Sequence, residues 1–271
     1  MDSRPIGVFD SGLGGLTCVK KLMEVLPQED IIYLGDTGRV PYGGRSRQTI
    51  IKYARQDIGF LRRFDIKAVV AACGTVSTNG LEEIAGDYDI PVLGVADAAA
   101  AAAAMATKNG RIGLIGTTAS IRSSVYDEKL RAHRPEAQVF KKACPLFVPL
   151  VEDGRTALGD PVLTMVAEEY LAELKAAGVD TLILGCTHYP LIRSTMARIM
   201  GPDVTLIDPG AETALLLRER LGAAGALSGR DRGTYRYFVT DSAENFGETA
   251  SLFLHSHVEG AVEHISLEDF S

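Results

Sequence analysis

Short apolar runs alternate with helix-like segments along almost the whole 271-residue chain. Strands that are separated by helices indicate βαβ units, in which parallel strands form a sheet that helices cover on both faces. We therefore expect an α/β fold with largely parallel sheets. The expected strands are 6–10, 30–36, 68–73, 91–95, 111–116, 138–143, 181–186, 204–208 and 235–241. The clearest expected helices are 15–26, 47–63, the alanine-rich 96–106 and 160–178.

The pattern occurs twice, which predicts two pseudo-symmetric α/β domains. RIGLIGTTAS (111–120) resembles PIGVFDSGLG (5–14) as a strand that ends in small and hydroxyl residues. A strand that ends in a cysteine follows each of them, at Cys73 and Cys186. Open α/β sheets bind ligands at the carboxyl ends of their strands, so we expect an active site in the cleft between the domains. The expected domains are 1–97 plus 210–271, which is discontinuous, and 98–209.

The net charge of −7 argues against nucleic acid as the main ligand, because phosphate binding requires concentrated Lys and Arg. The chain begins almost at once with a strand-like run and shows no signal-peptide pattern. The alanine-rich run is too short and too weakly apolar to span a bilayer. Four cysteines without CxxC spacing are typical of free thiols in a reducing compartment. We expect a cytoplasmic protein that does not contact a membrane.

Two of the four cysteines are candidates for chemistry. Free cysteines are commonly buried as space-filling side chains, and this interpretation suits Cys18 and Cys144. Cys73 and Cys186 differ because each ends a strand, has small neighbours and precedes an expected helix. A helix N-terminus lowers the pKa of a thiol, so we expect reactive thiols at both positions.

Other polar residues fall at the same edge of the expected sheets. Asp10 and Ser11 end the first strand, and His188 follows Cys186 by two residues. Asp10 could equally be a helix cap. The run GLGG (12–15) lacks the remaining residues of a phosphate-binding loop. A Cys-x-His pair could bind zinc, but no third and fourth ligands have matching spacing, so we expect no metal.

Two thiols that face each other across a cleft suit one reaction. A thiolate on one face of a carbon acid removes a proton, and a thiol on the other face returns one, which inverts a stereocentre. The sequence contains no nicotinamide, flavin or metal motif, and we expect no cofactor. Motifs alone do not exclude pyridoxal phosphate.

Five segments together resemble the glutamate racemase family, in the family's order and over nearly the whole chain. They are FDSGLGGL (9–16), GRVPYGGRS (38–46), the segment around Cys73, GTTASIRS (116–123) and LGCTHYPLI (185–192). The resemblance implies two pseudo-symmetric α/β domains and cofactor-independent interconversion of L- and D-glutamate, which supplies D-glutamate for peptidoglycan. It also implies a homodimer. An aspartate racemase and an amino-acid-binding relative without turnover are the alternatives, and retention of both cysteines argues against the second.

The resemblance implies a set of site residues. Cys73 and Cys186 are the acid/base residues, the first acting on D-glutamate and the second on L-glutamate. Asp10 supports Cys73, and Glu152 and His188 support Cys186. The residues implied in substrate binding are Asp10, Ser11, Tyr42, Gly43, Gly74, Thr75, Thr117, Ser120, Thr187 and His188. Two of them depart from the family pattern: Gly74 replaces the usual Asn and offers only its backbone N–H, and Ser120 replaces Thr but keeps the hydroxyl.

Overall fold

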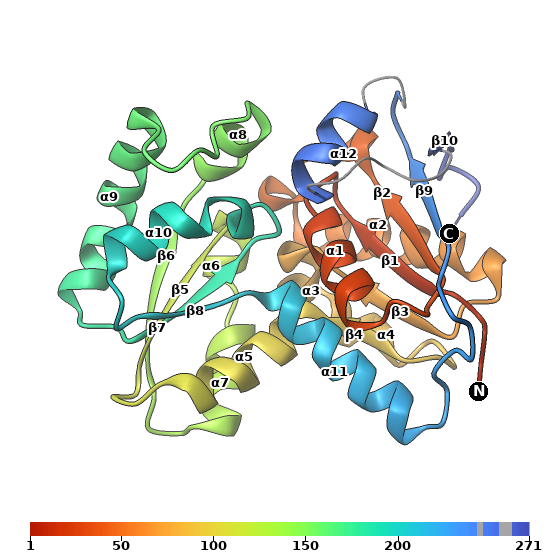
Figure 1. The fold of residues 1–271 in the computed structure, drawn as a ribbon, viewed down its shortest axis with the longest axis horizontal. Helices are drawn as coiled ribbons and strands as arrows, with labels where there is room; N and C mark the ends of the chain where they lie inside the picture. The colour runs from red at the N-terminus through yellow and green to blue at the C-terminus, as the bar shows by residue number, and fades with distance from the viewer. Residues whose placement is uncertain (243–245, 255–261, 271) are drawn as a thin grey trace.

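Ten strands in the described part of the chain form two separate sheets in this computed structural model. The structure describes residues 1–242, 246–254 and 262–270. Every strand pair in both sheets is parallel. The sheets lie in two lobes with helices on their faces (Figure 1), which confirms the expected fold class.

The first lobe is built on a sheet with strand order β10-β9-β2-β1-β3-β4. Its strands are β1 (Ile6–Asp10), β2 (Ile31–Gly35), β3 (Ala68–Ala71), β4 (Val92–Gly94), β9 (Tyr235–Val239) and β10 (Val262–His264). Strands β1, β2 and β3 are buried along their whole length, as expected for apolar runs in the middle of a parallel sheet.

The second lobe is built on a sheet with strand order β6-β5-β7-β8. Its strands are β5 (Arg111–Gly116), β6 (Gln138–Ala143), β7 (Thr181–Gly185) and β8 (Thr205–Ile207). This order repeats the β2-β1-β3-β4 part of the first sheet, with β5 in the place of β1 and β7 in the place of β3. The two strands that precede Cys73 and Cys186 therefore hold equivalent positions in the two lobes.

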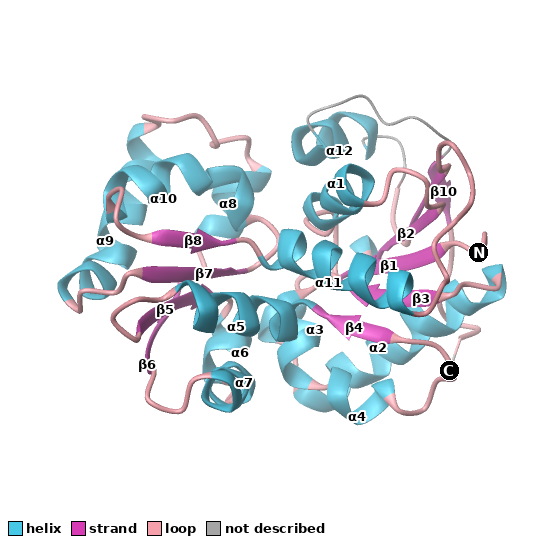
Figure 2. Cartoon of the chain, turned by 60° about the horizontal axis from the view of Figure 1, so that its bottom comes forward, coloured by secondary structure: helices cyan, strands magenta, loops and turns pink. Residues whose placement is uncertain are grey.

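The helices cover both faces of the sheets (Figure 2). The α-helices are α1 (Leu16–Val25), α2 (Arg47–Leu61), α3 (Gly74–Asn79), α4 (Leu81–Ala85), α5 (Val95–Ala106), α6 (Thr118–Arg122), α7 (Val125–His133), α8 (Phe147–Glu152), α9 (Pro161–Ala176), α10 (Arg193–Met200), α11 (Pro209–Ala223) and α12 (Phe246–Leu254). The 3-10 turns are η1 (Thr37–Arg39), η2 (Tyr42–Gly44), η3 (Arg62–Phe64) and η4 (Tyr189–Ile192).

Local chemistry fixes the ends of the long helices. The Ser46 hydroxyl accepts the Thr49 N–H and caps α2, and the Asp160 carboxylate accepts the Leu163 N–H and caps α9. Gly178 follows α9 in the left-handed region, at φ 67°, where glycine is favoured. These signals explain why the expected ranges of α2 and α9 lie within two residues of the observed ones.

Helices α5 and α11 carry the chain between the lobes and pack against each other (Figure 1). Helix α5 leads from β4 to β5, and α11 leads from β8 back to β9. The N-terminus and residues 262–270 both belong to the first lobe. We keep 1–97 plus 210–271 and 98–209 as the proposed domains, with the first boundary inside α5. In the described chain, no helix is both long and apolar enough to cross a bilayer.

The structure differs from the expected elements in two places. One is the segment after Cys186, and the other is the edge of the first sheet. Helix α3 begins directly after Cys73, but only a turn and η4 follow Cys186 before α10 begins at Arg193. Strand β10 was not expected, because three residues are too few to show an alternating pattern.

Candidate active site

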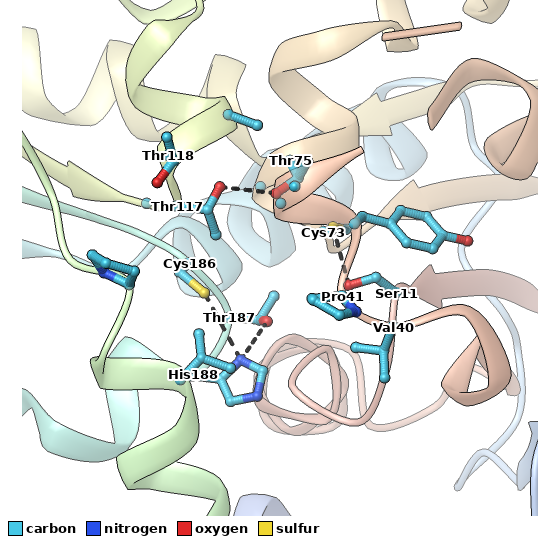
Figure 3. Close-up of a pocket in the computed structure, with 18 of the residues that line it drawn as sticks. Ser11, Val40, Pro41, Cys73, Thr75, Thr117, Thr118, Cys186, Thr187 and His188 are labelled. Carbon is cyan, nitrogen blue, oxygen red and sulfur yellow. Dashed lines mark hydrogen bonds between the residues drawn. The ribbon is translucent and has the colours of Figure 1, made fainter. Parts of the chain in front are cut away.

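A cavity of about 780 Å³ lies between the lobes, at the carboxyl ends of β1, β3, β5 and β7. Parallel strands place the residues that follow them at one edge of the sheet, which is why distant parts of the sequence meet here. Cys73 from the first lobe and Cys186 from the second both line this cavity, as Figure 3 shows. All four cysteines of the chain are free, and Cys18 and Cys144 are buried outside the cavity lining.

Cys73 is nearly enclosed, with 5% of its surface exposed. Its thiol donates a hydrogen bond to the Ser11 hydroxyl, with 3.6 Å between Sγ and Oγ. Burial raises the pKa of this thiol to about 12, and the nearby Asp10 carboxylate adds to the rise. The backbone N–H of Val76 in the first turn of α3 lowers this pKa in the expected direction, but desolvation outweighs it, so the net shift is upward.

Cys186 is half-buried and belongs to a polar chain of three side chains. Its Sγ lies 3.8 Å from Nδ1 of His188, and the other ring nitrogen of His188 lies 3.1 Å from Glu152 Oε1. Both nitrogens thus face acceptors, an arrangement that suits a protonated imidazole. Helix α8 supplies Glu152, which is 36 residues from His188 in the sequence.

The charge on His188 is favoured by these partners. Burial alone lowers the pKa of the imidazole, since only 7% of the residue is exposed. The hydrogen bonds with Cys186 and Glu152 outweigh burial and raise the pKa to about 10. A cation therefore lies against Cys186 at neutral pH, while the Asp10 carboxyl group lies near Cys73.

Asp10 lies behind the cavity and does not line it. Its Oδ2 accepts the backbone N–H groups of Gly12 and Gly15, at 3.1 and 3.0 Å. Its Oδ1 is buried and has no hydrogen-bond partner among the described residues. Burial raises the pKa of Asp10, and the charge of His188 opposes this rise.

Hydroxyl groups of the two lobes meet across the cavity. Thr75 Oγ1 and Thr117 Oγ1 are 3.0 Å apart, and Figure 3 shows them facing each other. Ser120 is fully buried behind Thr117, with 3.1 Å between the hydroxyls, and does not line the cavity. Its hydroxyl is therefore placed to orient Thr117 rather than to contact a ligand.

The remaining expected binding residues line the cavity: Ser11, Tyr42, Gly43, Gly74 and Thr187. The Tyr42 hydroxyl points away from the cavity, since it contacts the buried carboxylates of Asp36 and Asp57. Tyr42 is therefore available to a ligand through its backbone and ring rather than through its hydroxyl.

Sequence reasoning missed part of the lining. Helix α8 contributes Val148 and Pro149, which make one wall apolar. Arg45 and Arg122 line the cavity from the two lobes, and both are exposed to solvent. Arg45 lies in the quoted segment GRVPYGGRS and could have been found there. For α8 the resemblance pointed to Glu152 alone, and no sequence signal indicated Val148 or Pro149. Within the described residues, no group of three or more His, Cys, Asp or Glu side chains could hold a metal ion.

Comparisons with known proteins agree with this geometry. The family model described as Asp/Glu/Hydantoin racemase matches residues 12–217. A glutamate racemase from Geobacter metallireducens is 44% identical over 269 residues, which cover 99% of this chain and 98% of the relative.

Solved structures agree as well. The crystal structure of a glutamate racemase isoform from Bacillus anthracis superposes with a TM-score of 0.94 at 36% identity, covering 98% of this chain and 99% of that one. The structure of glutamate racemase from Francisella tularensis in complex with D-glutamate gives 0.91 at 38% identity, with both chains fully covered. The chain therefore belongs to the Asp/Glu/Hydantoin racemase family of isomerases, in which its full-length relatives are glutamate racemases.

Proposed function

We propose that this protein interconverts L-glutamate and D-glutamate by a two-base mechanism in which Cys73 and Cys186 act from opposite faces of the α-carbon. One observation carries the proposal: two thiols follow equivalent strands of the two lobes and line one cavity. The full-length similarity to glutamate racemases supports glutamate as the substrate.

In the direction from L to D, Cys186 takes the α-proton. The His188 imidazolium favours negative charge on the Cys186 sulfur, and Glu152 holds the ring in place. The proton moves from the α-carbon to Sγ of Cys186. The electron pair left on carbon is delocalised into the α-carboxylate.

Cys73 then returns a proton to the opposite face. Its raised pKa keeps it a thiol in the resting protein, so its S–H is the donor. The Asp10 charge makes the Cys73 thiolate formed in this step a stronger base, which suits proton removal from D-glutamate in the reverse direction. The product side holds a Cys186 thiol and a Cys73 thiolate, and exchange with water resets both.

The carbanionic transition state requires donors around the substrate carboxylates, because the α-proton of an amino acid is very weakly acidic. The hydroxyls of Ser11, Thr75, Thr117 and Thr187 and the backbone N–H of Gly74 are the groups proposed for this role. They belong to both lobes, so substrate binding would hold the lobes together. The proposed physiological role is supply of D-glutamate for peptidoglycan, in the cytoplasm and as a homodimer.

Circular dichroism of purified protein with each enantiomer of glutamate, without added cofactor, tests the proposal. Decay of the signal to zero from both sides supports glutamate racemisation. Decay with aspartate alone would instead indicate an aspartate racemase. A folded sample that changes neither amino acid would indicate a binding protein.

A further inference from the structure

A buried polar cluster lies behind the wall of the cavity that Tyr42 forms. We call it the Asp36 cluster and define it as Asp36, Arg39, Tyr42, Gln56 and Asp57. Asp36 follows β2, and Arg39 and Tyr42 belong to η1 and η2. Gln56 and Asp57 lie on α2. The carboxylates of Asp36 and Asp57 are fully buried, and the side chain of Arg39 is 23% exposed.

The hydrogen bonds to Asp36 satisfy an ionised carboxylate. Its Oδ2 accepts Nε of Arg39 at 2.6 Å and the hydroxyl of Tyr42. Its Oδ1 accepts the Thr240 hydroxyl at 2.8 Å. Three donors therefore converge on one side chain, two of them uncharged and one cationic, as an anion requires.

The hydrogen bonds to Asp57 are fewer and longer. Its Oδ1 accepts Nη2 of Arg39 at 3.2 Å, and its Oδ2 lies 3.2 Å from the Tyr42 hydroxyl oxygen. A phenol has one proton, and the short contact with Asp36 uses it. If Asp57 were ionised, its Oδ2 would face the lone pairs of the Tyr42 oxygen with no proton between them.

The balance of charge in the cluster also favours a neutral Asp57. One guanidinium, that of Arg39, faces two buried carboxylates, and Asp10 is the next acidic group that acts on Asp57. Burying a second uncompensated negative charge would cost several kcal/mol, whereas a neutral carboxylic acid avoids that cost.

We propose that Asp57 is a protonated positioning residue, whose O–H donates to Tyr42 and holds the Val40–Gly43 wall of the cavity in place. The hydrogen-bond chain then runs from Asp57 to Tyr42 to Asp36, and each proton has one acceptor. Burial raises the pKa of Asp57 well above its ordinary value, and the charge of Asp36 raises it further against the opposing Arg39.

Asp57 affects the cavity through the backbone of the segment that carries Tyr42. Val40, Pro41, Tyr42 and Gly43 all line the cavity, although Asp57 does not. A Cβ placed on Gly43 would lie 3.1 Å from Cβ of Thr117, so this wall packs directly against the second lobe. The inference that this wall contacts substrate rests on the function proposed above.

Paired substitutions at Asp57 test the kinetic consequence. Asp57→Asn keeps an N–H donor and a C=O acceptor, so KM for glutamate should stay within about twofold of the wild-type value. Asp57→Leu removes both groups, and the loss of a buried hydrogen bond should raise KM about tenfold while kcat changes little. Glu29→Gln is the matched control, because Glu29 is buried beside Lys67 at 2.5 Å and is remote from the cavity. Glu29→Gln should lower thermal stability and leave KM unchanged, whereas Asp57→Asn should leave thermal stability unchanged and KM within about twofold.

Infrared spectroscopy tests the proton directly and does not depend on the function. Protein labelled with ¹³C in its aspartate carboxyl groups should show a carboxylic-acid C=O band at neutral pH that disappears in Asp57→Asn. This readout also remains decisive if Asp57→Leu does not fold. A spectrum without that band, or an Asp57→Asn protein with a KM as high as that of Asp57→Leu, would overturn the proposal. Wild-type protein that racemises no amino acid would defeat the proposed function and leave the infrared result standing.

Discussion

The two cavity thiols differ in their electrostatic surroundings, and this difference gives them different resting roles. Cys73 is enclosed, lies near the Asp10 carboxyl group and has a pKa raised to about 12. Cys186 lies against the His188 imidazole, which is protonated at neutral pH. The proposed resting protein is therefore prepared to accept a proton at Cys186 and to donate one from Cys73.

Removal of either thiol should abolish racemisation. Cys73→Ala leaves no acid or base on one face of the α-carbon, and Cys186→Ala leaves none on the other. The matched control is Cys144→Ala, which removes a thiol that does not line the cavity and should retain activity. Circular dichroism measures racemisation, and thermal unfolding checks the fold. Full activity in either cavity variant would refute the two-base assignment.

His188 should make stability depend on pH in a defined direction. Its pKa is about 10 in the folded protein and about 6.5 in an unfolded chain. A raised folded pKa means that the stabilisation is complete below the unfolded value and is lost as the pH rises through about 10. Urea denaturation from neutral pH to above pH 10 should show a larger loss of unfolding free energy for wild type than for His188→Gln. Equal losses in the two proteins would contradict the charged state of His188.

At the scale of elements, the strands were the most predictable part of the chain. The ranges of β1, β5 and β6 agree with the expected 6–10, 111–116 and 138–143, because each strand is a compact run flanked by turn residues. Their order in the sheets also explains the pseudo-repeat, since β2-β1-β3-β4 corresponds to β6-β5-β7-β8.

The environment of the cavity was less predictable, because it depends on contacts between residues far apart in sequence. Cys73 is desolvated by packing that no local pattern reveals, and the hydroxyl of Tyr42 is turned away by carboxylates at positions 36 and 57. Ser120 matched a motif but lies behind Thr117. A motif identifies which residues are near a site, whereas side-chain direction follows from three-dimensional packing.

Gly74 at the start of α3 lies where the two lobes approach each other closely. A Cβ at this position would lie 2.5 Å from the carbonyl oxygen of Gly185, the residue before Cys186. Ordinary contact requires about 3.4 Å, so one of the cysteine loops must move by about 1 Å. Displacements of this size between catalytic groups can cost about 100-fold in rate.

Gly74→Ala should therefore lower kcat/KM by about two orders of magnitude. Gly44→Ala is the matched control, because Gly44 also lines the cavity but a Cβ there would meet no atom within 4 Å. Steady-state kinetics of the two variants tests this prediction. Unimpaired activity in Gly74→Ala would show that the lobes accommodate a side chain at this position.

At the scale of the whole molecule, the net charge of −7 repels an anionic substrate. Glutamate carries one net negative charge at neutral pH. Arg45 and Arg122 line the cavity from opposite lobes, and neither forms an ion pair with any residue that the structure describes. Two cations at about 8 Å from the substrate in water would each contribute about 0.5 kcal/mol of attraction.

The double variant Arg45→Gln/Arg122→Gln should lower kcat/KM about fivefold at low salt, with kcat nearly unchanged. The difference from wild type should shrink as salt is added, because the Debye length falls to about 10 Å at 0.1 M. The double variant Arg218→Gln/Arg220→Gln, an equal charge change at exposed positions of α11, should have no such effect. A double variant with wild-type kcat/KM and wild-type salt dependence would rule out a role for Arg45 and Arg122 in attracting the substrate.

The central claim, that two thiols act on opposite faces of one carbon, is tested most directly by racemisation in D₂O. Proton NMR and mass spectrometry, after separation of the enantiomers early in the reaction, measure deuterium at the α-carbon. The two-base account predicts that the product enantiomer carries deuterium from its first appearance, while the remaining substrate keeps its proton, whichever enantiomer is supplied. Product that retains the substrate's own α-proton would show that a single base removes and returns it, and would contradict the account.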